Sequence, residues 1–574
     1  MRAFFKKNNH IHEDMSSIEY MPLQERKTQD RAHSLSFERL EIPIFQARFY
    51  EIIFTVAIII AGLFSRAVYL QIIKGQEYNA TYESLHSRRE WILAPRGLIT
   101  DRNGVTLAYN TPGQNPNEFK RLYPDGEFFS SVIGYIGRID AQELYSKDTS
   151  GLGQGFGEHT HLPFDLVGKT GVESSYENFL AGTHGKIEKP MSAKGNSLQA
   201  PLVSNPKPGD TLVLSIDARM QKALTGFLKE KMTDVGSKAA AAVVLNPRNG
   251  EILSLISLPA FDNNAITPEL LEDKSRPLFN RALAGEYPPG SAIKPFMASA
   301  ALNEHIISPT RIIKDEGKIF ISSAFDPSVT WMFKSWKALG PVDMRRALAL
   351  SSNIYFYTVG GGYKDIQGLG IERIKTYLER FGFGSKSGID IPGEQQGFIP
   401  TPAWKQENEK TNWYIGDTYN SAIGQGYIRV TPLQLALATS GVANKGTIYA
   451  PHVLKEVRDE KGEKIFSYPQ KPIKENIVPQ EYFDIVRDGM RLAVKEGTVY
   501  RLSSLGVDLG AKTGTAQAGI GLEPHAWVTL FMPFDNPQIV VTILLEHGIG
   551  GEQSAVPVAK KFLEWYLANE KFKS

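Results

Sequence analysis

The 574-residue chain contains no cysteine. Without a thiol it forms no disulfide, uses no cysteine nucleophile and offers no cysteine ligand to a metal. The chain also has almost no excess of charge of one sign. Its formal net charge is +2, which gives no reason to expect nucleic acid as a partner. The lack of cysteine suits an oxidising compartment outside the cytoplasm, and it excludes thiol-based catalysis.

One long apolar run is present, from Ile52 to Ile73, and Arg66 is its only charged residue. As a helix the run spans about 33 Å, which is enough to cross a bilayer. A cleaved signal peptide fits poorly because the run begins far from Met1. We therefore predict a transmembrane helix at residues 51–73. A buried core helix is the other alternative.

The residues before this run are polar, mix basic with acidic side chains and show no sustained apolar period. Such a composition is typical of disorder, so residues 1–50 are predicted to be a disordered tail. Lys and Arg upstream of the run place this tail in the cytoplasm. The rest of the chain is then expected outside the cytoplasm, anchored by a single span in the cell (inner) membrane.

Three short strings in the second half describe one candidate site: Ser291-Ala-Ile-Lys294, Ser351-Ser-Asn353 and Lys512-Thr-Gly514. On a helix, the three-residue spacing of Ser291 and Lys294 puts the amine in reach of the hydroxyl. A lysine can take the proton of a serine only if its own charge is suppressed, which burial and a nearby second cation both achieve. Lys512 is a candidate for that cation, so the strings predict a serine acyl-transfer enzyme.

The residues around the strings support the same chemistry. The Pro-Pro-Gly stretch at 288–290 breaks the chain just before Ser291, so this serine is expected at a helix N-terminus. Its backbone N–H and that of Thr515 can then point at a developing oxyanion. The hydroxyls of Ser351 and Thr513 can relay protons or hold the substrate, and the amide of Asn353 can orient the substrate backbone.

Local patterns indicate a β-rich module followed by a mixed domain. Short strands with tight turns are expected at residues 90–97 and 101–104, where Asn103-Gly104 is a hairpin signal. The mixed domain is expected to hold an antiparallel sheet that includes residues 512–514, with helices packed on it. Its predicted elements are strands at 211–216, 239–245, 252–258, 526–533 and 539–545, and helices at 218–232 (with Asp217 as N-cap) and 556–567.

Longer segments resemble the class B penicillin-binding proteins, from about Leu70 to the end of the chain. Residues 94–104 and 167–173 are similar to the N-terminal pedestal of that family, and residues 287–294 and 525–527 to its catalytic domain. Residues 413–418, 423–427 and 431–434 look most like the elongation-type members, with the division-type members as the closest competitor.

The resemblance implies a multidomain α+β protein with a serine β-lactamase-like transpeptidase domain, whose central antiparallel sheet is flanked by helices. The implied divisions are a tail at 1–50, a transmembrane helix at 51–73, a pedestal at 74–235 and a transpeptidase domain at 236–574. It also implies partners: peptidoglycan stem peptides, β-lactams, membrane lipid, a SEDS-type (RodA-like) glycan polymerase and elongation-complex proteins.

For the site, the resemblance implies a D,D-transpeptidase in which Ser291 attacks the bond between two terminal D-alanines. Lys294 is then the base, and Ser351, Asn353 and Lys512 complete the relay. Thr513, Gly514 and Thr515 would bind the substrate carboxylate and shape the oxyanion site, and β-lactams would acylate Ser291.

Two departures from the family pattern matter. Residues 307–350 contain neither cysteine nor histidine, whereas several relatives carry a zinc site there, so we predict no metal and no cofactor. No glycosyltransferase string lies between residues 75 and 202. Three alternatives stay open: a division-specific transpeptidase, a D,D-carboxypeptidase that uses water instead of an amine, and a non-catalytic scaffold.

Overall fold

The computed structural model describes residues 46–78, 87–113, 118–145, 161–190, 202–322, 326 and 328–569. Most of the predicted tail, residues 1–45, lies outside this range. The chain divides into two compact units, Met1–His86 and Ser87–Ser574, which are described separately.

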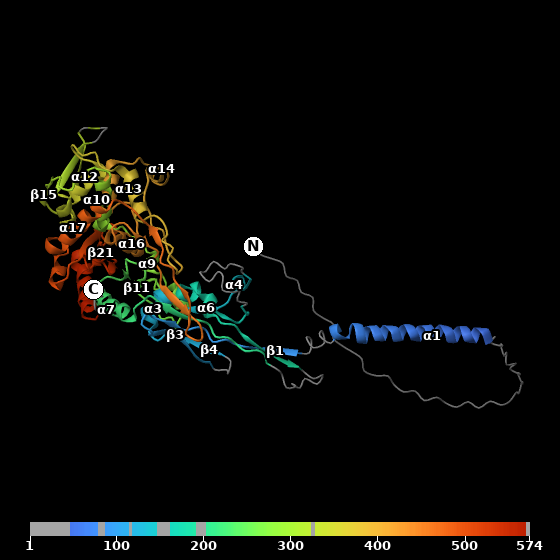
Figure 1. Ribbon diagram of the computed structural model, residues 1–574. Coiled ribbons are helices and arrows are strands. Elements are labelled where there is room, and N and C mark those ends of the chain that lie inside the picture. The colour runs from blue at the N-terminus through green and yellow to red at the C-terminus, as the bar shows by residue number, and fades with distance from the viewer. Residues whose placement is uncertain are drawn as a thin grey trace, which may run out of the picture. The chain divides into compact units, whose positions relative to one another are not determined.

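In the first unit, the described residues form a long helix, α1 (Gln46–Val68), continued by a π-helical turn at Tyr69–Ile73 (Figure 1). The stretch Arg48–Ile73 is long and apolar enough to cross a membrane, and none of its residues is buried in the protein. The helix therefore has the properties expected for the predicted membrane span.

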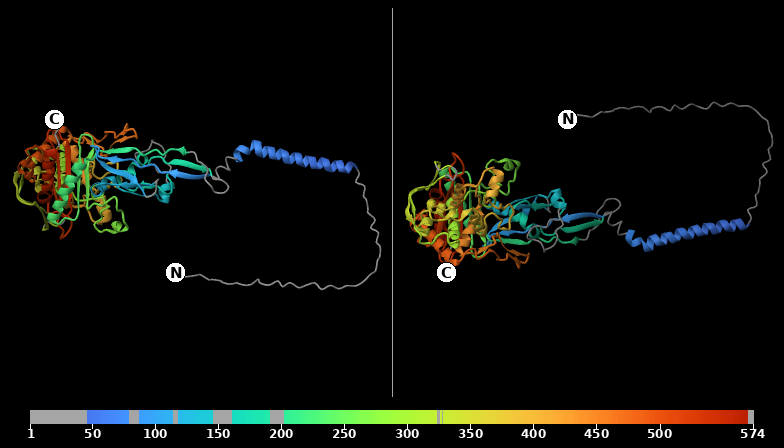
Figure 2. Two further views of the ribbon diagram at one scale, coloured as in Figure 1. Left: turned by 90° about the horizontal axis from the view of Figure 1, so that it is seen from below. Right: turned by 90° about the horizontal axis from the view of Figure 1, so that it is seen from above.

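The second unit is mixed α and β, as expected, and its largest sheet joins segments far apart in the sequence. The order of this sheet is β18-β17-β9-β2-β3-β4. Four strands come from the first half of the chain: β2 (Ile99–Thr100), β3 (Thr106–Pro112), β4 (Phe119–Leu122) and β9 (Thr211–Leu214). The other two, β17 (Leu454–Arg458) and β18 (Lys464–Ser467), come from the second half and lie beside them in Figure 1 and Figure 2.

The Asn103-Gly104 signal forms a hairpin turn between β2 and β3, where Gly104 has φ +87°. Residues 101–104 are therefore the turn itself and not a strand. Another three-stranded sheet pairs β1 (Ser87–Ile92) with β7 (Gly185–Pro190) and β7 with β8 (Leu202–Ser204). The smaller helices of this region are α3 (Gly126–Ile133), α5 (Gly171–Ser175) and α6 (Glu177–Leu180).

A five-stranded antiparallel sheet carries the candidate site. Its order is β11-β10-β22-β21-β20, with β10 (Ala240–Leu245), β11 (Ile252–Leu258), β20 (Gly510–Ala516), β21 (His525–Met532) and β22 (Ile539–Leu545). The predicted hairpin of 239–258 and both late strands are confirmed to within one residue. β20 is an edge strand, so one side of it is open to the elements that hold the site.

Alternate residues of β10 point to opposite faces of this sheet, as the two-residue period of a strand requires. Ala241, Val243 and Leu245 belong to one hydrophobic core, while Ala240, Ala242 and Val244 belong to a second. The second core is closed by α7 (Ala218–Val235) and α18 (Val556–Asn569).

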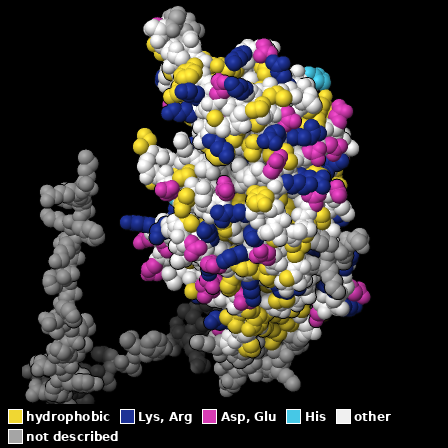
Figure 3. Space-filling model, turned by 90° about the vertical axis from the view of Figure 1, so that its left-hand side faces the viewer, with side chains coloured by type: hydrophobic (Ala, Val, Ile, Leu, Met, Phe, Trp, Pro, Cys, Tyr) yellow, Lys and Arg dark blue, Asp and Glu magenta, His cyan; other side chains and the backbone are white. Residues whose placement is uncertain are grey.

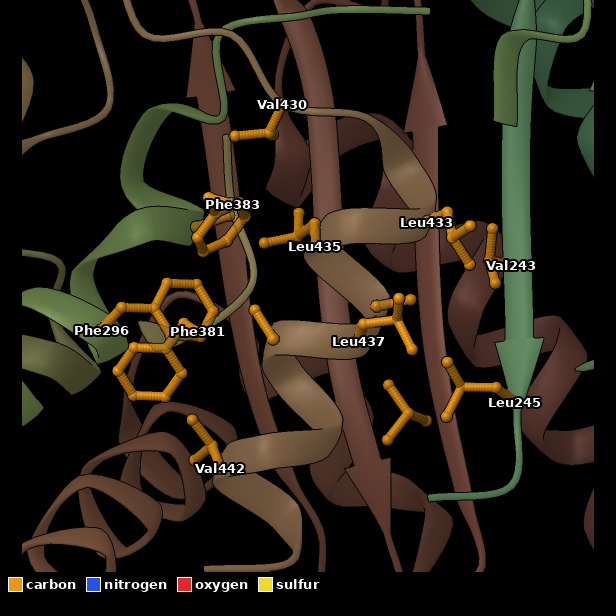
Figure 4. Close-up of a cluster of buried hydrophobic side chains, with 14 of the residues drawn as sticks. Val243, Leu245, Phe296, Phe381, Phe383, Val430, Leu433, Leu435, Leu437 and Val442 are labelled. Atoms are coloured by element: carbon orange, nitrogen blue, oxygen red, sulfur yellow. The ribbon is translucent and has the colours of Figure 1, made fainter. Parts of the chain in front are cut away.

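The first core is built around α16 (Pro432–Ala443), which is buried along its whole length. Figure 4 shows Leu433 and Leu437 of this helix pointing toward Val243 and Leu245, while Leu435 points toward Phe383. The helix lies between the sheet and a helical layer. That layer includes α10 (Lys294–Asn303), α11 (Met344–Ala349), α12 (Asn353–Gly361), α13 (Gly370–Arg380), α15 (Ile415–Ala422) and α17 (Gln480–Glu496).

Candidate active site

Ser291 lies in a single 3₁₀ turn, Gly290–Ile293, that leads into α10. The sequence predicted Ser291 at a helix N-terminus, and the structure places it in the 3₁₀ turn from which α10 continues at Lys294. Gly290, at the start of this turn, has φ +53°, and its amide donates to the Gly424 carbonyl at 2.9 Å. A Cβ at Gly290 would lie 2.6 Å from the carbonyl oxygen of Thr515, so the turn fits directly against β20.

Lys294 is fully buried at the first position of α10. Its Nζ donates to the Ser351 carbonyl at 2.8 Å and to Asn353 Oδ1 at 2.7 Å, and it lies 3.2 Å from Ser351 Oγ. The described residues contain no hydrogen bond between this amine and the Ser291 hydroxyl. The spacing argument placed the amine in reach of Ser291, whereas here three acceptors of the Ser351–Asn353 turn hold it.

Ser351 occupies the turn between α11 and α12, in the left-handed conformation with φ +58°. Its Oγ lies 3.2 Å from Lys294 Nζ and 3.0 Å from Lys512 Nζ. One hydroxyl therefore bridges the two amines, which is the geometry of a proton relay. The hydroxyl of Ser352 caps the next helix by accepting from the Tyr355 amide at 3.0 Å.

Lys512 is fully buried on β20 and also donates to the Thr513 carbonyl at 3.0 Å. Burial lowers the pKa of Lys512 to about 7. Burial, and after it the like charge of Lys512, hold the pKa of Lys294 well below its ordinary value, and Asp315 partly opposes them. A buried lysine with a depressed pKa is a competent general base near neutral pH.

Both threonines of β20 hydrogen-bond to other residues of the chain, Thr513 from a buried position and Thr515 from an exposed one. The hydroxyls of Thr513 and Thr498 are hydrogen-bonded at 2.8 Å, and Thr515 Oγ1 accepts from the Gly551 amide at 3.2 Å. The Thr515 carbonyl accepts from Gln425 Nε2 at 3.4 Å. The backbone of Thr515 thus faces away from β21, on the open edge of the sheet beside the Ser291 turn.

Gly514 permits the close approach of β20 to the nucleophile turn. A Cβ at Gly514 would lie 2.5 Å from the Pro289 carbonyl oxygen. The structure therefore brings together every residue of the predicted site: the serine on its turn, the two lysines, the Ser351–Asn353 turn and the 513–515 segment of β20.

Three contacts of the site were missed by sequence reasoning: Gln425 on Thr515, Thr498 on Thr513, and Asp315 on Ser352. Gln425 lies within a family-like string, which was a usable signal. Thr498 and Asp315 lie outside the strings, and only the fold brings them to the site. Within the described ranges, no group of three or more His, Asp or Glu side chains could hold a metal ion.

Comparisons with known proteins agree with this geometry. The penicillin-binding protein transpeptidase domain matches residues 240–564, and the penicillin-binding protein dimerisation domain matches residues 115–214. The peptidoglycan D,D-transpeptidase MrdA of Haemophilus influenzae is 35% identical over 480 residues, which cover 78% of this chain and 69% of that protein.

Two solved structures are similar over most of the chain. The complex of penicillin-binding protein 2 with MreC from Helicobacter pylori has a TM-score of 0.69 and 26% identity, covering 84% of this chain and 99% of that one. A peptidoglycan synthase complex that coordinates polymerization and crosslinking has a TM-score of 0.70 and 26% identity, covering 92% and 99%. The chain therefore belongs to the class B penicillin-binding proteins of the penicillin-binding protein 2 (MrdA) type, which are peptidoglycan D,D-transpeptidases.

Proposed function

We propose that this chain crosslinks peptidoglycan stem peptides during cell wall elongation, with Ser291 as the residue that is acylated. One observation carries the assignment of roles: two buried amines, on Lys294 and Lys512, converge on the Ser351 hydroxyl beside the turn that presents Ser291. A neutral lysine held in this way can accept a serine proton at neutral pH.

In the first step, Ser291 Oγ attacks the carbonyl carbon of the bond between two terminal D-alanines, and its proton passes to Lys294. A neutral amine has two N–H groups and one lone pair. It can donate to the Ser351 carbonyl and to Asn353 Oδ1 while its lone pair takes a proton from Ser291 or Ser351. Ser351 and Lys512 can then deliver a proton to the leaving amine of D-alanine as the C–N bond breaks.

The oxyanion that forms during the attack needs two donors. The backbone N–H groups of Ser291 and Thr515 are our candidates, because the Thr515 backbone borders the Ser291 turn on the open edge of β20. Thr513 and Thr515, with Gly514 between them, are the candidates for binding the terminal carboxylate, and Lys512 supplies the positive charge beneath them.

In the second step, an amine from a neighbouring stem peptide attacks the ester carbonyl. The lysine relay takes one proton from this amine as the new amide bond forms, and it returns a proton to the Ser291 oxygen as the ester bond breaks. β-Lactams, which contain a strained amide, are expected to acylate the same serine. Their ester then blocks the second step.

The proposed topology is a single-pass membrane protein with a cytoplasmic N-terminus at residues 1–50 and an extracytoplasmic catalytic unit. The apolar stretch Arg48–Ile73, which is long enough to cross a membrane, supports the proposed membrane anchor. We keep the divisions 51–73, 74–235 and 236–574 as proposals, with β17 and β18 of the third segment completing the pedestal sheet.

Two of the similar structures guide the proposed partners. The Helicobacter pylori penicillin-binding protein 2 was solved with MreC, and the synthase complex couples polymerization to crosslinking. We propose that this chain works with a SEDS-type, RodA-like polymerase and with elongation-complex proteins. Recovery of a division polymerase instead would assign the chain to the division-specific type.

The test is an assay with a stem-peptide donor ending in D-Ala–D-Ala and an excess of an amine acceptor. The full chain in detergent is expected to release D-alanine and form the new amide. Ser291→Ala should do neither, while the matched control Ser503→Ala, at an exposed serine, should behave like the native chain. Release of D-alanine with only hydrolysed donor would favour a carboxypeptidase, and no release at all would overturn the proposal.

A further inference from the structure

Asp315 is a buried carboxylate beside the site that the proposed reaction steps do not use. It ends the short strand β12 (Ile313–Asp315), which pairs with β15 (Gly340–Val342), and it is 1% exposed. A buried carboxylate is costly unless it is hydrogen-bonded or paired. Its Oδ1 accepts from the Gly317 amide at 2.8 Å, and its Oδ2 accepts from the Ser352 hydroxyl at 2.5 Å.

The bond to Ser352 reaches the catalytic turn. The Ser352 hydroxyl donates to Asp315 and accepts from the Tyr355 amide at 3.0 Å, so both its donor and one acceptor site are used. The orientation of the hydroxyl that caps α12 is therefore fixed by Asp315. Ser351, the preceding residue, has φ +58°, a conformation that a serine keeps only where its surroundings hold it.

Asp315 also balances charge around the Lys294 amine. The groups facing that amine come from several elements: Lys512 from β20, Asp315 from β12, the neutral Ser351 and Asn353 from the turn, and the ring of Phe356 at 5.4 Å. Among the described residues, Asp315 is the carboxylate that acts on the charge of Lys294. Two lysines and one carboxylate therefore share this buried region.

We propose that Asp315 is a positioning residue for acyl transfer: through Ser352 it holds the Ser351 turn against the Lys294 amine, and its charge favours the protonated form of that amine. The inference deepens the proposed function, because acylation of Ser291 is its readout. The two roles predict different effects, one on the maximal rate and one on the pH dependence.

The first variant is Asp315→Asn, which keeps the shape of the side chain but removes the charge. If the amide oxygen keeps the Gly317 bond, its NH₂ group faces Ser352, whose hydroxyl can no longer donate to residue 315 and must reorient. We expect the limiting rate of acylation by a fluorescent penicillin to fall about tenfold. We also expect the acidic limb of the pH profile to move to lower pH, because a carboxylate that favoured the protonated form of Lys294 has been removed.

The second variant, Ser352→Ala, separates the two roles. It breaks the link to the turn but leaves the carboxylate in place. The limiting rate should fall by a similar factor while the acidic limb stays within about 0.3 pH units of the native profile. This variant also keeps the proposal testable if Asp315→Asn does not fold.

Asp343→Asn is the matched control, because Asp343 caps α11 by accepting from the Arg346 amide at 2.9 Å and does not act on Lys294. It should leave both the melting temperature and the acidic limb close to the native values, because Asn caps a helix about as well as Asp. The inference is overturned if Asp315→Asn and Asp343→Asn share the native pH profile, or if Ser352→Ala acylates at the native rate. If the native chain itself is not acylated, the proposed function fails instead.

Discussion

The chemistry at the residue scale rests on two lysine amines buried on either side of one serine hydroxyl. Lys294 and Lys512 are both fully buried, and both approach Ser351 Oγ. Burial disfavours the ammonium form, and each amine also disfavours the charge of the other. The site thus keeps a neutral amine available at a pH where an exposed lysine would be protonated.

The pH dependence of acylation follows from this arrangement. The pKa of Lys294 is lowered, so its neutral fraction, and with it the acylation rate, rises with pH through a range well below 10.5. Lys512→Met removes the like charge and should move the acidic limb to higher pH, opposite to Asp315→Asn. Stopped-flow measurement of penicillin acylation between pH 5 and 10 checks this, and a limb that stays or moves to lower pH would contradict it.

Sequence reasoning identified the residues of the site but not their contacts. The three strings named Ser291, Lys294, Ser351, Asn353 and Lys512 because each string is short and local. Spacing along one helix placed the Lys294 amine in reach of Ser291, but it did not reveal the acceptors of that amine, which lie in the turn 57 to 59 residues away. Contacts across such separations depend on the fold, which local spacing does not encode.

At the scale of elements, the close packing of the Gly290–Ile293 turn on β20 sets the position of the nucleophile. Gly290 and Gly514 both lie where a Cβ would meet a backbone oxygen, of Thr515 and Pro289 respectively. The absence of side chains at these two points lets two backbones touch beside the site. The oxyanion donors that we propose depend on this contact.

Gly290→Ala is therefore expected to damage the site. The added Cβ would lie 2.6 Å from the Thr515 carbonyl oxygen, at a residue with φ +53°. The turn must move away from β20, and we expect acylation by penicillin to fall at least about 100-fold, the loss seen when one oxyanion donor is removed.

The matched control is Gly226→Ala in the middle of α7, where a Cβ meets nothing within 4 Å. It should raise the free energy of unfolding by about 0.5–1 kcal/mol and leave acylation unchanged. Equal acylation rates for the two variants would show that the turn does not need its contact with β20.

Elements with local signals were predicted well. The hairpin of β10 and β11 and helix α7 with its Asp217 cap were confirmed, because strand alternation and capping residues lie within a few positions. The 3₁₀ turn at Ser291 was not predicted, since it results from packing against β20. The pairing of β17 with β9 was also missed, because residues 454 and 214 meet only in the folded chain.

At the scale of the whole molecule, the catalytic region and the six-stranded sheet that contains β9 and β17 belong to one unit, Ser87–Ser574. Buried polar contacts hold this unit together. Tyr176 donates to Asp390 at 2.7 Å, and Asp390 accepts from the amides of Val453 and Leu454 at 2.7 and 2.8 Å.

On the face of the molecule shown in Figure 3, basic and acidic side chains are interspersed, in keeping with the small net charge.

A buried ionic cluster secures the N-terminal part of this unit. Glu173 accepts from Arg96 at 2.6 Å and from Arg121 at 2.8 Å, and it is completely buried. Glu173→Gln would leave the buried Arg121 guanidinium without its counter-charge, while Arg96 keeps its pair with Glu177 at 2.6 Å, so we expect a loss of about 3–5 kcal/mol in the free energy of unfolding.

The control is Glu127→Gln, which breaks an exposed pair with Lys229 at 3.1 Å and should cost less than about 1 kcal/mol. Chemical denaturation of both variants gives the comparison. Similar losses for the two would mean that the buried cluster does not stabilise the N-terminal part of this unit.

The central claim is that Ser291 carries the acyl group. The most direct measurement is to treat the full chain in detergent with benzylpenicillin and to locate the adduct by peptide mass spectrometry. We predict a single adduct on Ser291, which is lost in Ser291→Ala while that variant keeps the native melting temperature. An adduct on another residue, or none on the folded native chain, would contradict the account.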